Sequence, residues 1–109
     1  MSKKSGNKRP QPDVLRLQLW QWINAIPPGQ VATYGQLAKL AGAPAMSRFV
    51  GRVLSELPIG STLPWHRVIS SSGAITNPNR SEQARRLRKE GVLVNSGRRV
   101  SLARYGWAP

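Results

Sequence analysis

The fold of this chain is constrained most by two helix-length stretches in which apolar residues recur at regular spacing, residues 13–26 and residues 44–57. Proline follows each stretch directly. The first begins at Asp13, a candidate N-cap, and its apolar side chains recur at helical spacing until Pro27 and Pro28 end it. Its stripe consists of Leu15, Leu19, Trp22, Ile23 and Ile26. The sequence therefore predicts an amphipathic helix with one face in the core.

A helix-turn-helix is predicted next. Thr33 and Gln36 have the spacing of a capping box, so after a short extended entry a helix should begin at Tyr34 and end at Gly42. Pro44 then opens a second helix, whose apolar stripe consists of Met46, Phe49, Val50, Val53, Leu54 and Leu57. Its opposite face carries Arg48, Gly51, Arg52 and Ser55. Two short helices with arginines exposed on the second are typical of a motif that lays its second helix in a DNA groove.

Short strands and one further helix are expected in the rest of the chain. Residues 61–76 combine a β-branched run with Ser-Ser-Gly and another apolar pair, which indicates a hairpin, or wing. A basic helix capped by Asn79 or Ser81 should run through Glu90 to a stop at Gly91. A terminal hairpin is predicted around Asn-Ser-Gly, with alternating Val92, Val94, Val100 and Leu102.

These elements predict the α/β class, mainly α, with a winged helix-turn-helix-like domain over residues 13–109. Residues 1–12 are polar, basic and interrupted by proline, which predicts a flexible basic arm. No apolar run approaches the roughly 18 residues of a membrane span, and the basic start lacks a secretory pattern. We therefore expect a cytoplasmic, nucleoid-associated protein without a membrane partner. A monomer is the default expectation.

The charge balance favours a polyanionic partner. Lysine and arginine total 17 against 4 acidic residues, which gives a formal net charge of +13. Nucleic acid is the leading class of partner, although ribosomal, nucleoid and membrane-surface proteins share this balance. The chain has no cysteine, which excludes a disulfide, a thiolate metal site and a thiol nucleophile. The sequence predicts no cofactor and no metal.

The string PWHRV at residues 64–68 resembles the PCHRV active-site motif of the O6-alkylguanine-DNA alkyltransferases, with Trp65 in place of the alkyl-accepting cysteine. That replacement is the mark of the alkyltransferase-like proteins. Residues 26–42 look like the family's entry to the helix-turn-helix and residues 43–54 like its recognition helix. The resemblance implies a protein that binds O6-alkylguanine in duplex DNA by nucleotide flipping and passes the lesion to nucleotide-excision repair proteins.

The resemblance also implies roles for individual residues. Arg48 matches the arginine that fills the gap left by the flipped nucleotide, and Tyr34 matches the tyrosine that presses on the flanking phosphate. Trp65 lies in the pocket for the flipped base. The other residues expected to contact DNA or the lesion are Met46, Ser47, Gly51, Arg52, Val68, Ser71 and Arg80.

No catalytic residue is expected. His66 and Glu90 match the pair that removes the proton from the cysteine, but the indole of Trp65 is not a nucleophile. We expect the pair to survive as a structural hydrogen bond. The loop at residues 77–81 lacks the tyrosine that commonly covers the alkyltransferase pocket, so the resemblance predicts a roomier pocket that accepts bulky adducts.

Two other classes of function remain open on the sequence. A helix-turn-helix transcription regulator would use the same helix, but its exposed face offers no Asn or Gln to read base edges. An enzyme that hydrolyses the lesion would need a nucleophile or second acid beside His66 and Glu90, and the sequence does not point to one.

Overall fold

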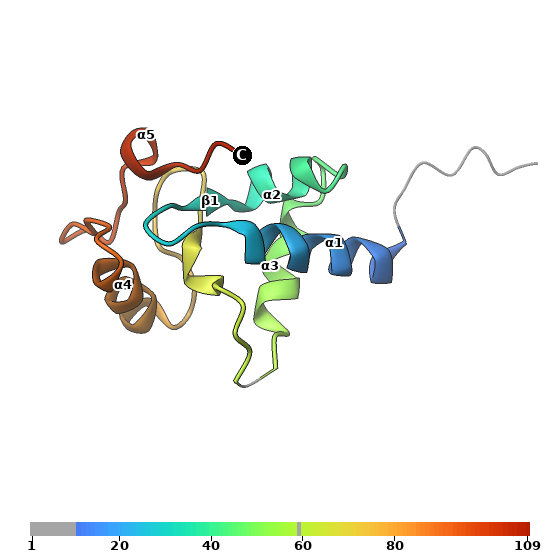
Figure 1. The fold of residues 1–109 in the computed structure, drawn as a ribbon, viewed down its shortest axis with the longest axis horizontal. Helices are drawn as coiled ribbons and strands as arrows, with labels where there is room; N and C mark the ends of the chain where they lie inside the picture. The colour runs from blue at the N-terminus through green and yellow to red at the C-terminus, as the bar shows by residue number, and fades with distance from the viewer. Residues whose placement is uncertain (1–10, 59) are drawn as a thin grey trace, which may run out of the picture.

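The computed structural model describes residues 11–58 and 60–109, and it is mainly helical (Figure 1). The elements follow in the order helix α1 (Pro12–Ala25), strand β1 (Ala32–Thr33), helices α2 (Tyr34–Leu40) and α3 (Ser47–Ser55), 3-10 turn η2 (Trp65–Arg67), strand β2 (Val68–Ile69), and helices α4 (Arg80–Lys89) and α5 (Leu102–Tyr105). The predicted class is confirmed. Of the predicted basic arm, residues 1–10 lie outside the described residues, and Pro12 already belongs to α1.

Helix α1 buries most of the predicted stripe, since Leu15, Leu19 and Ile23 are all 1% exposed or less, whereas Trp22 is only partly buried and Ile26 is buried just beyond the end of the helix. The prediction of Asp13 as its N-cap was wrong. Gln11 occupies the cap position, because Pro12 has the fixed φ and missing N–H that suit the first turn of a helix. Asp13 lies in that first turn, where its charge suits the positive end of the helix dipole.

The helix-turn-helix forms from α2 and α3. The capping box is confirmed, because the Gln36 amide donates to Thr33 Oγ1 at 3.0 Å and the Thr33 amide donates to Gln36 Oε1 at 3.4 Å. Helix α3 begins at Ser47 rather than at the predicted Pro44. The chain first makes a turn in which the Met46 amide donates to the Ala43 carbonyl at 2.9 Å, and Met46 becomes the N-cap.

The predicted wing hairpin is wrong. Strand β2 pairs in parallel with β1, with Ala32 opposite Val68 and Thr33 opposite Ile69. Only the turn of the predicted hairpin is present, in which the Ser70 amide donates to the Ala74 carbonyl at 3.1 Å and the Gly73 amide donates to the Ser70 carbonyl at 2.9 Å. Both residues of β2 are buried, as in a parallel strand that is covered on its two faces. A hairpin strand with one exposed face would instead alternate buried and exposed residues.

The terminal hairpin is reduced to a turn. The Asn95 amide donates to the Arg99 carbonyl at 3.1 Å, but Arg99 forms an isolated bridge with Ala74 rather than a ladder. Leu102 begins α5 instead of continuing a strand. Helix α4 has Asn79 at its N-cap position, as predicted, although without a side-chain cap bond.

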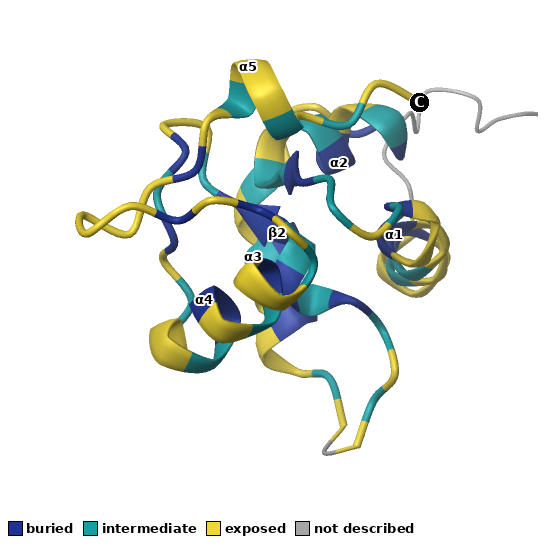
Figure 2. Ribbon diagram, turned by 60° about the vertical axis from the view of Figure 1, so that its left-hand side comes forward, coloured by how far each residue is buried: buried dark blue, intermediate teal, exposed yellow. Residues whose placement is uncertain are grey.

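The buried residues, which are dark blue in Figure 2, form two apolar clusters, and the two strands contribute to both of them. Ala32 and Val68, which are paired across the strands, belong to the cluster formed mainly by α1, α2 and α3. Val31 and Ile69 belong to the second cluster, with α4 and the C-terminal segment. Because neighbouring strand residues point to opposite faces, this small sheet holds the helix-turn-helix and the α4 segment in fixed relation.

Gly73 provides a test of the turn that follows β2. Its φ is +83°, and a Cβ there would lie 2.5 Å from the Val100 carbonyl oxygen. We expect Gly73→Ala to destabilise the protein by more than the about 1–2 kcal/mol that a left-handed conformation costs by itself. Gly91→Ala is the matched control, since Gly91 has a φ of +87° with nothing within 4 Å of its added Cβ. Urea unfolding should show the larger loss at Gly73; equal losses would contradict the contact.

Candidate functional site

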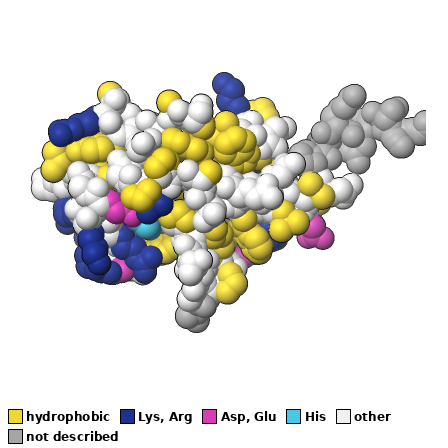
Figure 3. Space-filling model, in the orientation of Figure 1, with side chains coloured by type: hydrophobic (Ala, Val, Ile, Leu, Met, Phe, Trp, Pro, Cys, Tyr) yellow, Lys and Arg dark blue, Asp and Glu magenta, His cyan; other side chains and the backbone are white. Residues whose placement is uncertain are grey.

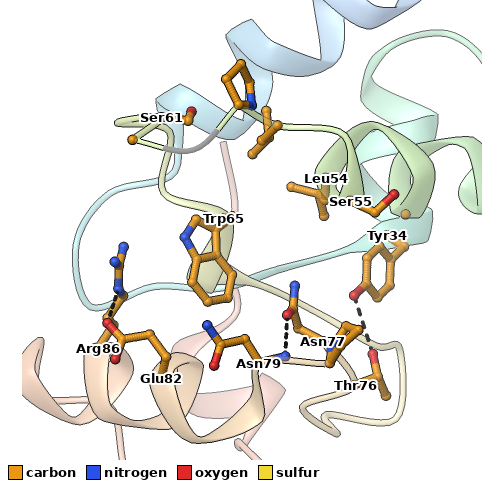
Figure 4. Close-up of a pocket in the computed structure, with 15 residues that line it drawn as sticks. Tyr34, Leu54, Ser55, Ser61, Trp65, Thr76, Asn77, Asn79, Glu82 and Arg86 are labelled. Atoms are coloured by element: carbon orange, nitrogen blue, oxygen red, sulfur yellow. Dashed lines mark hydrogen bonds and ion pairs between the residues drawn. The ribbon is translucent and has the colours of Figure 1, made fainter.

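A cavity of about 730 Å³ opens between α3, the segment that follows it, η2, and the start of α4 (Figure 4). It has a mixed lining of aromatic, aliphatic, amide and charged side chains, as ligand pockets commonly do. Its lining residues are Tyr34, Gly51, Leu54, Ser55, Leu57, Pro58, Gly60, Ser61, Trp65, Thr76, Asn77, Pro78, Asn79, Glu82 and Arg86. Of the sequence-predicted contact residues, the structure brings Tyr34, Gly51 and Trp65 together here.

Trp65 forms one wall of this cavity. It is the first residue of η2, and the turn is closed by the Arg67 amide donating to the Pro64 carbonyl at 3.0 Å. The guanidinium carbon of Arg86 lies 5.2 Å from the centre of the indole ring, within cation–π range. Arg86 was not among the predicted site residues, although its spacing from Glu82 is that of an ion pair on a helix.

Tyr34 lies across the cavity from Trp65 (Figure 4). The capping box at Thr33 fixes the start of α2 and therefore the position of this side chain. The Tyr34 hydroxyl lies 3.4 Å from Thr76 Oγ1, in the loop that precedes α4. Both sides of the cavity are thus tied to regular elements, which favours a preformed pocket.

The exposed face of α3 leads into the cavity. Gly51 and Ser55 line it, and Arg48 and Arg52 share their face by helical spacing and are exposed. Within the described ranges, neither arginine takes part in a salt bridge. Met46 and Ser47 lie at the start of the same helix. A polyanion that met this face would therefore find two free guanidinium groups beside the pocket mouth.

Three predicted contact residues lie elsewhere. Val68 is 1% exposed, so its side chain belongs to the core and its assignment to a DNA- or lesion-contacting surface is wrong for the side chain. Ser71 is exposed in the turn after β2, away from the cavity lining. Arg80 is exposed as the first residue of α4 but does not line the cavity. The arginine at the pocket wall is Arg86.

The predicted pair of His66 and Glu90 is joined by a hydrogen bond of 2.8 Å between His66 Nε2 and Glu90 Oε2. Arg67 also binds this carboxylate, through Nη2 at 2.6 Å and Nε at 3.0 Å, and the Gly29 amide donates to it at 3.2 Å. Arg67 Nη1 then donates to the Ile26 carbonyl at 2.7 Å. Glu90 is therefore a structural junction between η2, the end of α4 and the segment after α1.

The electrostatics of this junction fix its protonation. Burial by itself would raise the pKa of Glu90, but hydrogen bonds from Arg67, His66 and the Gly29 amide hold that pKa at about 2. Burial lowers the pKa of His66 below its ordinary 6.5, and the nearby Arg67 and Arg86 act in the same direction, against the attraction of Glu90. At neutral pH the pair is thus a neutral imidazole that donates from Nε2 to a carboxylate.

Basic side chains gather on the molecule around α4 (Figure 3).

In residues 11–58 and 60–109 there is no group of three or more His, Cys, Asp or Glu side chains that could hold a metal ion. Over the same ranges, no helix has the length and hydropathy needed to cross a membrane.

Residues 15–92 match the family described as the DNA-binding domain of 6-O-methylguanine DNA methyltransferase. The chain is 47% identical over 102 residues to the DNA base-flipping protein of Escherichia coli, covering 92% of this chain and 79% of that protein. It is 33% identical over 105 residues to alkyltransferase-like protein 1 of Schizosaccharomyces pombe, covering 89% and 97%. The chain is an alkyltransferase-like member of this family.

Solved structures agree with this assignment. The S. pombe alkyltransferase-like protein, in complex with damaged DNA that contains O6-carboxymethylguanine, superposes with a TM-score of 0.84 at 32% identity over 89% of this chain and 97% of that one. The O6-methylguanine methyltransferase of Mycobacterium tuberculosis superposes with a TM-score of 0.62 at 32% identity, over 75% and 50%. Because the chain has no cysteine, it is not an alkyl-accepting enzyme.

His66 allows a clean test of the junction, because it is the sole histidine of the chain. Its pKa is lowered in the folded protein, so between that value and 6.5 the unfolded chain binds more protons than the folded one. The free energy of unfolding should therefore fall as the pH drops from 7.5 to 5.5. His66→Gln should remove most of this dependence in urea titrations at the two pH values. A dependence that persists in the variant would show that another group is responsible.

Proposed function

We propose that this protein binds O6-alkylguanine in duplex DNA by flipping the nucleotide into the cavity beside Trp65, without transferring the alkyl group. The observation that carries the proposal is the continuity of the exposed arginine face of α3 with a cavity walled by Trp65 and Tyr34. The related S. pombe protein, which is described in complex with damaged DNA, has the same fold. A weakened O6-alkylguanine pair costs less to open than a normal pair, and this difference is a source of selectivity.

The cavity is the expected site of the flipped base. Its volume of about 730 Å³ lies in the upper part of the range of small-molecule sites. The loop of Asn77, Pro78 and Asn79 lines one side without a tyrosine. This supports acceptance of bulky O6 substituents as well as methyl.

The protein acts as a damage signal in this proposal. Since it has no thiol to accept the alkyl group, a bound lesion persists until another pathway removes it. We assign that removal to nucleotide-excision repair, for which the bound, distorted duplex would be the substrate. The protein works as a monomer in contact with chromosomal DNA.

Lesion preference is the direct test. A short duplex with one O6-methylguanine should bind at least about tenfold more tightly than its unmodified twin at near-physiological salt, a difference of about 1.4 kcal/mol. Fluorescence titration measures both affinities through the intrinsic tryptophans. Equal binding would indicate a general basic helix-turn-helix protein, such as a transcription regulator. A mass shift of the protein after incubation would instead indicate alkyl transfer.

Arg48 tests the flipping step. If its guanidinium fills the gap left by the extruded nucleotide, Arg48→Ala should weaken binding to the O6-methylguanine duplex by about 1–3 kcal/mol. Arg48→Lys is the matched control, because it keeps the charge but lacks a planar group that stacks on bases. We expect it to restore the affinity for undamaged DNA and only part of the affinity for the lesion. An unchanged lesion affinity in Arg48→Ala would remove Arg48 from this role.

A further inference from the structure

Arg86 lines the cavity with a guanidinium group that is only partly used in contacts within the protein. Its Nε donates to Glu82 Oε2 at 2.7 Å, and its guanidinium lies over the ring of Trp65. These two contacts hold the guanidinium at the wall of the cavity. Among the described residues, neither terminal nitrogen of Arg86 has a hydrogen-bond partner. The guanidinium is therefore held at one end and offers its other donors to the cavity.

The indole of Trp65 adds a donor beside them. Its nitrogen lies on the side of the ring that faces Arg86, and it makes no hydrogen bond with the other residues drawn around the cavity (Figure 4). Indole and guanidinium N–H groups donate and cannot accept. This wall of the cavity is thus a group of donors that needs a ligand with adjacent acceptors.

Glu82 sets the charge of this wall. It also binds Arg85, whose Nη2 lies 2.6 Å from Glu82 Oε2, so one carboxylate faces two guanidinium groups. Hydrogen bonds from Arg85 and then Arg86 hold the pKa of Glu82 at about 2. The cluster keeps a net positive charge throughout the physiological range. Arg85 is the more exposed of the pair, with 62% of its side chain accessible against 40% for Arg86, and it does not line the cavity.

We propose that Arg86 reads the O6 and N7 edge of the flipped base and selects a guanine-type purine. This inference rests on the proposed function, because it needs a base in the cavity. Both positions of an O6-alkylguanine are acceptors, and arginine commonly meets this pair with two donors. A purine with an amino group at position 6 presents a donor there instead and leaves one guanidinium N–H unpaired. Arg86 is accordingly a specificity-determining residue that accepts O6-alkylguanine and rejects N6-alkylated purines.

Base analogues in one duplex sequence test this assignment. The reference duplex carries O6-methylguanine, the second carries 7-deaza-O6-methylguanine, and the third carries 2-amino-6-(methylamino)purine. Each analogue changes one edge acceptor and leaves the rest of the base in place. The wild-type protein should lose about tenfold in affinity for either analogue, the scale of a lost base-edge contact.

The protein variants complete the cycle. Arg86→Gln should bind the reference duplex about tenfold more weakly and should lose the preference for it over the two analogues. Arg85→Gln is the matched control, since it removes the same charge from the same carboxylate and should keep the discrimination. Thermal unfolding of both variants checks that the fold is retained.

The outcomes separate the two proposals. A wild-type protein that does not distinguish O6-methylguanine from guanine overturns the proposed function and this inference together. Lesion preference without any penalty for the analogues overturns the role of Arg86 alone. So does a penalty that is the same in the wild-type protein and in Arg86→Gln.

Discussion

The carboxylate of Glu90 is the contact on which the rest of the structure depends. It accepts hydrogen bonds from His66 and Arg67 in η2 and from the Gly29 amide in the loop after α1, while its own residue ends α4. A buried carboxylate is costly unless its partners satisfy it, and here three donors surround it. The junction therefore fixes the position of η2 relative to α4. Because Trp65 is the first residue of η2, its position is fixed as well.

The pairing of the two-residue strands β1 and β2 is the second connection that holds the walls of the cavity in place. Strand β2 follows η2 directly and pairs with β1, which directly precedes α2. Tyr34 therefore directly follows β1, and Trp65 begins the η2 turn that leads into β2, so both walls of the cavity are tied to the paired strands. Gln83, which is fully buried, reinforces the link by donating from Nε2 to the His66 and Val68 carbonyls at 3.1 and 2.9 Å. A cavity whose walls are fixed in this way is preorganised for a ligand that fits it.

The helices could be predicted from the sequence because their signals are local. Apolar spacing located α1 and α3, and the Thr33 capping box placed Tyr34 at the start of α2. The strands could not, since β1 and β2 pair across two helices and the local turn chemistry favours hairpins. Arg86 was missed for a similar reason. Its helical partner Glu82 is visible in the sequence, but its position over Trp65 depends on tertiary packing.

The junction also explains how a chain without a nucleophile can retain His66 and Glu90. In a thiol enzyme of this family the pair would be read as proton-transfer machinery. Here the same carboxylate binds Arg67 and accepts from the Gly29 amide, so loss of Glu90 would leave a largely buried guanidinium without its carboxylate and one backbone amide without its acceptor. Leaving a buried charge without its partner destabilises a protein by about 3–5 kcal/mol. The fold therefore depends on Glu90 whether or not a thiol is present, and Trp65 can stand in place of a nucleophile while this junction and the cavity beside it remain.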